Sequence, residues 1–117
     1  MICDNNKIEI AMPCKAEYVG ILRLASAGAA NEAGFDIETI DDVKILVSEI
    51  FNSVFNAGIP SFKTDIHMEK GKLFIDFEVC EGNDILAGAN DMTLPILEAL
   101  AREVTVHGRN KISLVIV

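Results

Sequence analysis

The chain has 117 residues, of which 50% are hydrophobic, and it carries a formal net charge of −8 at pH 7. This length predicts one domain, residues 1–117, which is large enough to bury a core. The charge argues against a nucleic-acid partner, since phosphate binding needs clustered Lys and Arg, and it favours a basic protein partner. No run reaches the roughly 20 apolar residues of a membrane helix, and the N-terminus lacks a basic segment followed by an apolar one. We therefore expect a cytoplasmic protein without membrane contact or secretory signal.

The N-terminal part of the chain predicts a strand followed by a helix. From Lys7 to Met12 apolar and polar residues alternate, as in a half-buried strand, and Pro13 ends the alternation. Residues 16–33 are rich in Ala and Leu and contain no proline, which favours a helix. Gly34 follows as the expected C-terminal cap.

A second helix is predicted between Thr39 and Gly58. Thr39 and Asp42 have a spacing close to that of a capping box, which marks the start of a helix. At about 100° per residue, the apolar residues fall on one arc, namely Val43, Leu46, Val47, Ile50, Phe51 and Val54. The opposite face carries Glu49, Asn52, Ser53 and Asn56. We expect this polar face either to be solvated or to line a cleft.

The second half of the chain predicts two hairpins with a helix between them. Strict alternation of apolar and polar residues gives the first hairpin one oily face and one polar face. The expected elements are strands at 62–69 and 73–80 around a turn at Lys70-Gly71, a loop at 81–91, a helix at 92–102, and strands at 104–107 and 111–117. This order predicts a two-layer sandwich of the α/β (α+β) class, with a mixed or antiparallel sheet and helices on one face.

The cysteines and histidines do not form a recognisable ligand set. Cys3, Cys14 and Cys80 are odd in number and have no CxxC spacing, so we expect reduced thiols and no metal site. His67 and His107 are far apart in the sequence and have no third ligand beside them, so we expect ordinary surface histidines.

Three segments together resemble the GHKL (histidine-kinase-like, or Bergerat-fold) ATPases, and in particular the bacterial anti-sigma factor serine/threonine kinases. The segments are Ala33-Gly34-Phe35, residues 41–58 and residues 94–104, and the resemblance extends from about Pro13 to the C-terminus. It implies a Bergerat ATPase-like sandwich, with ATP and Mg²⁺ as the cofactors of an intact member of the family.

The first motif of that family lies on a helix. A Glu acts there as general base, an Asn four residues later holds Mg²⁺, and a His often follows. Val47-Ser48-Glu49 matches the start of the motif, so the resemblance places Glu49 at the general base. Ser53 stands at the position of the Asn and Ala57 at that of the His. Asn52 is one residue away, which rotates it by about 100° around the helix.

The other two motifs depart further from the family. In DxGxG the Asp receives the adenine amino group, but here the segment is Cys80-Glu81-Gly82-Asn83-Asp84 and a thiol is a weaker acceptor. In GxGL the backbone N–H groups approach the phosphates, but here Asp91-Met92-Thr93-Leu94 brings a repelling carboxylate. We therefore expect a degenerate ATP site with lost or weak binding, marked by Ser53, Cys80, Gly82 and Thr93.

Two charged residues have both a functional and a plain interpretation. Glu49 is either a residual catalytic base or a charged residue on a solvated helix face. Arg23 lies in Ile21-Leu22-Arg23-Leu24, a segment that resembles the first helix of the anti-sigma kinases. In that family the helix helps form the dimer or sigma-factor contact surface, which makes Arg23 a candidate contact residue. The alternative is a lone exposed arginine.

The leading functional hypothesis is a degenerate, anti-sigma-factor-like regulatory domain that works by binding a protein. The expected partner is a sigma factor or an anti-anti-sigma protein, and pairing with a second copy is a further option. The alternative is an active ATP-dependent anti-sigma serine/threonine protein kinase, with Glu49 as base and Ser53 near the metal. A third hypothesis is a structural subunit without a signalling role.

Overall fold

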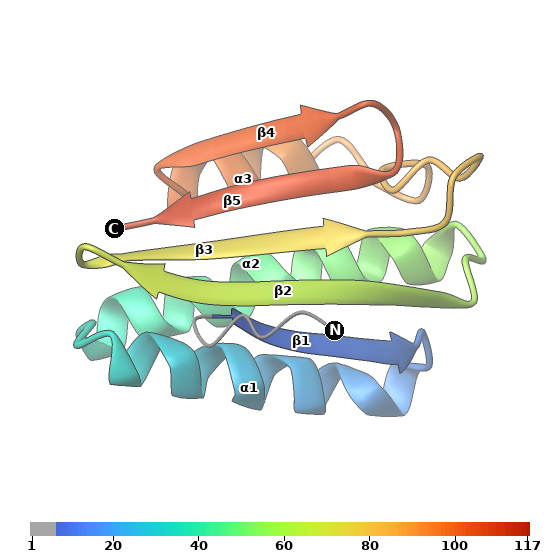
Figure 1. Cartoon of the computed structure of the whole chain (residues 1–117). Coiled ribbons are helices and arrows are strands. Elements are labelled where there is room, and N and C mark those ends of the chain that lie inside the picture. The colour runs from blue at the N-terminus through green and yellow to red at the C-terminus, as the bar shows by residue number, and fades with distance from the viewer. Residues whose placement is uncertain (1–6) are drawn as a thin grey trace.

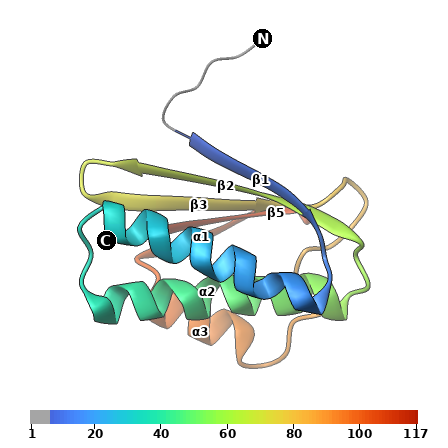
Figure 2. The same ribbon diagram turned by 90° about the horizontal axis from the view of Figure 1, so that it is seen from below.

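The computed structural model describes residues 7–117. Within these residues the fold has two layers, a five-stranded sheet and three α-helices, and Figures 1 and 2 show that the helices cover one face of the sheet. Along the chain the elements are β1 (Lys7–Pro13), a 3-10 turn (Ala16–Tyr18), α1 (Val19–Glu32), α2 (Ile37–Asn56), β2 (Ser61–Glu69), β3 (Lys72–Glu78), α3 (Thr93–Leu100), β4 (Glu103–His107) and β5 (Lys111–Ile116). The predicted element order and the two-layer fold class are confirmed. Cys3 and the expected lack of a secretory signal fall on residues outside the described range.

The sheet has the order β1-β2-β3-β5-β4, and every neighbouring pair is antiparallel. The turn between β2 and β3 consists of Lys70 and Gly71, with φ angles of 53° and 76°. Positive φ at both central residues fits a type I′ turn, whose twist matches that of the flanking strands. No helix within residues 7–117 is long and apolar enough to cross a membrane.

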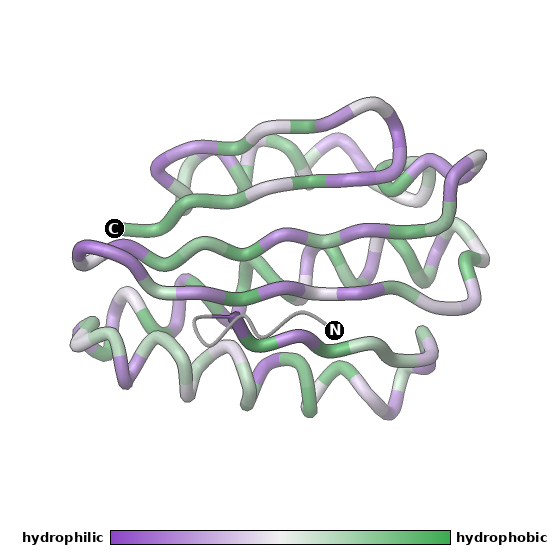
Figure 3. The backbone as a smooth tube through the Cα atoms, viewed as in Figure 1, coloured by the Kyte–Doolittle hydropathy of each residue, from purple (hydrophilic) through white to green (hydrophobic). Residues whose placement is uncertain are grey.

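The core lies between the sheet and the helices. In β3 Leu73, Ile75 and Phe77 are buried while the residues between them are only half-buried, as the alternation predicted. Figure 3 shows this alternation of apolar and polar residues along the central strands. From the helix layer Phe51 packs edge-on against Phe62, with ring centroids 5.7 Å apart. The predicted apolar stripe of α2 is therefore the helix's contact with the sheet.

The start of α2 differs from the predicted capping box. The helix begins at Ile37, and its N-cap is Asp36, whose side chain accepts a hydrogen bond of 2.8 Å from the backbone N–H of Thr39. The prediction that Thr39 and Asp42 mark the helix start was therefore wrong. The backbone hydrogen bond from Thr39 lowers the pKa of Asp36, because it stabilises the charged form of the carboxyl group.

The Asp36 cap makes a prediction about stability and pH. A carboxyl group whose pKa is lowered on folding stabilises the fold above its unfolded pKa of about 3.9, and this contribution is lost as the pH falls through the folded value. We therefore expect Asp36→Ala to lower the thermal midpoint at pH 7, with a difference from wild type that shrinks below about pH 4. Asp36→Asn is the control, since Asn caps equally well without titrating. A difference between wild type and Asp36→Ala that is independent of pH would contradict this role.

Candidate functional site

The segment that joins β3 to α3 covers Ser53, one residue of the polar face of α2. Ser53, at the position of the family's metal-binding Asn, is only 1% exposed. Its Oγ donates a buried hydrogen bond of 2.8 Å to the backbone carbonyl oxygen of Ile85. Ser53 is thus neither solvated nor beside an open cleft. The helical pattern could not predict this, because it does not reveal which loop will cover a helix. The hydroxyl that would face a metal ion is already bonded to the protein.

Gly88 brings the same segment into direct contact with the backbone of α2. A Cβ atom built on Gly88 would lie 2.5 Å from the Ala57 nitrogen and 2.8 Å from Asn56 Cβ, and it would run into the Ser53 carbonyl oxygen. Backbone atoms cannot rotate out of the way as a flexible side chain can, so only glycine fits here without a shift of the segment. Figure 1 shows the segment, yellow to orange, passing beside the C-terminal end of α2.

The segment is also fixed from the side of the sheet. The N–H of Ile85 donates to the Arg109 carbonyl oxygen at 2.7 Å, in the turn between β4 and β5. The carboxylate of Asp84 lies 3.5 Å from the guanidinium of Arg109. The Ile85 side chain is fully buried and belongs to the hydrophobic core. Residues 84–88 are therefore held between α2 and the β4–β5 turn.

The N-terminus of α3, which matches the family's phosphate motif, is closed by a local turn. Thr93 is 3% exposed, and its Oγ1 accepts a hydrogen bond of 3.1 Å from the Asn90 N–H. The Asn90 side-chain oxygen accepts 2.8 Å from the Met92 N–H, and the Asn90 carbonyl accepts 3.2 Å from the Thr93 N–H. The backbone donors of Met92 and Thr93 are therefore paired within the chain.

Glu49 and Gly82, two other positions of the expected ATP site, take no part in the hydrogen bonds described for Ser53 and Thr93. Glu49 lies half-buried on α2, one turn before Ser53 and on the same side of the helix. Gly82 is exposed in the turn after β3, and its φ of 91° is a conformation that favours glycine. The structure brings Ser53 into contact with residues 84–88, whereas Gly82 lies on the surface.

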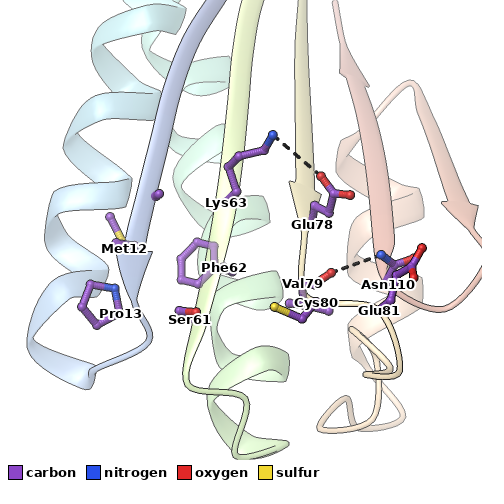
Figure 4. Close-up of a pocket in the computed structure, with 11 residues that line it drawn as sticks. Met12, Pro13, Ser61, Phe62, Lys63, Glu78, Val79, Cys80, Glu81 and Asn110 are labelled. Carbon is purple, nitrogen blue, oxygen red and sulfur yellow. Dashed lines mark hydrogen bonds and ion pairs between the residues drawn. The ribbon is translucent and has the colours of Figure 1, made fainter.

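Cys80 lines a different hollow, of about 670 Å³, at the end of the sheet where β1 and β3 finish and β2 begins. Figure 4 shows Lys63 reaching toward Glu78 along one side and the Asn110 amide bonded to the Val79 carbonyl on the other. The full lining is Ala11, Met12, Pro13, Ser61, Phe62, Lys63, Glu78, Val79, Cys80, Glu81 and Asn110. None of Glu49, Ser53, Gly82 and Thr93 belongs to it. Cys80 is therefore the one expected site residue that opens onto this hollow.

Cys14 and Cys80, the two cysteines in the described range, are both free. Cys80 is exposed, whereas Cys14 is half-buried and burial raises its pKa. Since the thiolate is the reactive form, we expect Cys80 to react with a maleimide at least about tenfold faster than Cys14 at neutral pH. Single-thiol variants in a Cys3→Ser background, followed by mass spectrometry, test this order. Equal rates in the folded protein, with equal rates in urea as the control, would contradict it.

Arg23 lies exposed on α1, and its guanidinium donates to the Ser48 hydroxyl on α2 at 3.2 Å. The Ser48 hydroxyl in turn donates to the Lys44 carbonyl at 2.7 Å. Ile21 and Leu24, on the same helix, are 53% and 75% exposed. Arg23 is thus an oriented cation beside exposed aliphatic side chains.

The histidines make ordinary contacts. His67 stacks on Phe74 with ring centroids 4.6 Å apart, and His107 Nε2 lies 3.0 Å from the Ser113 hydroxyl. Within residues 7–117 no group of three or more His, Cys, Asp or Glu side chains is placed to hold a metal ion.

Comparison with known proteins identifies relatives in Bacillus. Serine-protein kinase RsbW of Bacillus cereus strain B4264 is 38% identical over 88 residues, which are 74% of this chain and 51% of the relative. RsbW of Bacillus cereus strain ATCC 10987 is 35% identical over 106 residues, or 90% of this chain and 61% of the relative. RsbW of Bacillus thuringiensis strain Al Hakam is 36% identical over 88 residues, again 74% and 51%.

The chain is related to the RsbW-type serine-protein kinases. The resemblance to the GHKL anti-sigma kinases is thereby confirmed. The chain spans only about half to three-fifths of the length of these relatives. No family model matches it.

Sequence reasoning missed the residues that cover Ser53 and that form the turn before α3. Ile85, Gly88 and Asn90 lie in the segment expected only to be a short loop. The available signal was Ile85 with Leu86, a pair of large aliphatic residues inside an otherwise small and polar stretch. Such a pair indicates a loop that packs onto the core, but it does not identify the helix that the loop covers.

Proposed function

We propose that the chain is an anti-sigma-type regulatory domain that acts by binding a protein and that binds Mg-ATP weakly or not at all. The observation that carries the proposal is the hydrogen bond from the Ser53 hydroxyl to the Ile85 carbonyl, made at the position of the family's metal ligand. The relation to RsbW supports the regulatory role. In this proposal residues 1–117 are one domain, it works in the cytoplasm, and it is not an enzyme.

Three features of the site support the loss of nucleotide binding. The Ser53 hydroxyl is bonded within the protein, and Gly88 leaves no space between the segment and the α2 backbone. The N–H groups of Met92 and Thr93 already have partners, so they are not free to hold a phosphate. ATP and Mg²⁺ could enter only after residues 84–90 had left α2.

Titration calorimetry with Mg-ATP tests the nucleotide part of the proposal. We expect no heat of binding up to millimolar nucleotide, with an RsbW of Bacillus cereus as the positive control. Micromolar binding would overturn this part and favour the active-kinase alternative. In that case Glu49→Gln would test Glu49 as base, because it should abolish phosphotransfer while leaving nucleotide binding intact.

The proposed partner is a sigma factor or an anti-anti-sigma protein from the same genome. Arg23, held by Ser48 beside the exposed Ile21 and Leu24, is the proposed contact on α1. Purified candidates of both classes should be tested by pull-down and surface plasmon resonance. We expect Arg23→Ala to weaken the complex at least about tenfold, as is common for an interface arginine. Lys111→Ala, which removes the same charge from β5, should leave the affinity unchanged. If none of these candidates bound, the proposed partner class would be refuted.

A further inference from the structure

Residues 84–89 pack against α2 as a bound ligand would, although they belong to the same chain. We propose that these residues are an internal plug that takes the place of a nucleotide, so that the protein stays in one closed form and binds its partner independently of nucleotide. This inference rests on the proposed function and adds to it the absence of nucleotide control.

The plug has specific contacts on the side of α2. Its carbonyl at Ile85 accepts from the buried hydroxyl of Ser53, and its Gly88 lies against the backbone of the last turn of the helix. A hydrogen bond to a buried hydroxyl together with a backbone-to-backbone contact leaves no room for a third group. A nucleotide and the plug therefore exclude one another at this place.

The plug is also anchored at both of its ends. At the first end the Ile85 N–H bonds to the Arg109 carbonyl, and the Ile85 side chain is fully buried. At the other end Asn90 and Thr93 form the turn that leads into α3. Opening the plug would expose Ile85 to water and leave the Ser53 hydroxyl and the Ile85 carbonyl without their partner, so the closed form is favoured.

A cysteine placed behind the plug reports its opening. In a chain with Cys3, Cys14 and Cys80 replaced by Ser, Ser53→Cys puts a thiol at a position that is 1% exposed. We expect iodoacetamide to label it at least 100-fold more slowly than Asn56→Cys, an exposed position one turn further along α2. Adding Gly88→Ala should then speed the labelling of Cys at position 53 at least tenfold.

Gly28→Ala is the matched control for this substitution. A Cβ on Gly28 meets nothing within 4 Å, so the same change on α1 should leave the labelling rate as it was. Neither glycine has a positive φ, so alanine adds no backbone strain at either position. Labelling of Ser53→Cys as fast as that of Asn56→Cys, or no acceleration by Gly88→Ala, would overturn the plug.

A second measurement does not depend on any variant that could fail to fold. Amide hydrogen exchange of the wild-type chain should show Ile85 protected to the same degree as Ile75 in β3, and fast exchange at Ile85 would refute the plug.

Partner affinity should be equal with and without millimolar Mg-ATP, and a change of more than threefold would refute nucleotide independence. These readings test the plug, whereas calorimetry and the pull-down test the proposed function, so the two failures are distinguishable.

Discussion

Phe51→Ala should lower the free energy of unfolding by about 3–5 kcal/mol, which is the range for truncation of a buried phenylalanine. The Phe51 side chain is 2% exposed and packs edge-on against Phe62 of β2. Its removal would leave a cavity between α2 and the sheet, at the contact that holds the two layers together. Since small domains are stable by only about 5–15 kcal/mol, the variant is expected to be close to unfolding. Urea denaturation followed by circular dichroism measures the change.

Phe55→Ala provides the matched control on the same helix. Phe55 lies one turn after Phe51 with a ring centroid 6.4 Å away, but it is 45% exposed. A half-exposed ring loses less buried surface on truncation, so we expect a loss of about 1 kcal/mol or less. Equal losses for the two variants would show that Phe51 is not the contact described.

The second large effect is expected from Ser53→Asn, which restores the residue type of the family's metal position. We expect no gain of Mg-ATP binding, and a loss of stability of about 1–3 kcal/mol. The larger amide has no space at a position that is 1% exposed, and the substitution removes the hydroxyl that donates to the Ile85 carbonyl. Calorimetry and urea denaturation measure the two parts of this prediction.

Asn52→Ser controls for the chemistry of that substitution, because Asn52 is exposed on the adjoining position of α2. Its effect on stability should lie within about 0.5 kcal/mol of zero, as for most surface changes. Micromolar Mg-ATP binding by Ser53→Asn with unchanged stability would mean that the covering segment yields to a restored metal ligand.

The strands and the contact face of α2 were predictable because half-burial leaves a period in the sequence. Leu73, Ile75 and Phe77 alternate with polar residues because every second side chain of β3 faces the helices. The helix start was less predictable. Asp36 and Thr39 are both residues that cap helices, and only the backbone conformation of Asp36, with ψ at 171°, selects it.

The candidate site was predicted only in part. The departures at Ser53, Cys80 and Thr93 could be recognised from the sequence, because each replaces a residue type that the family's chemistry requires. The burial of Ser53 could not, because it depends on where a loop without any period folds back. Gly88 is a single glycine in the sequence, and its need for close approach arises only from the position of α2.

The turn at Lys70 and Gly71 has a consequence for the order of folding. It joins β2 and β3 through two residues, so their pairing closes the shortest possible loop and carries a small entropic penalty. By contrast β1 and β2, which also pair in the sheet, are separated in the sequence by α1 and α2, so their pairing closes a much longer loop. We therefore expect the central hairpin to be structured early in the folding transition state and β1 to join the sheet late. Kinetic φ-values near 1 in β1 and near 0 in the hairpin would reverse that order.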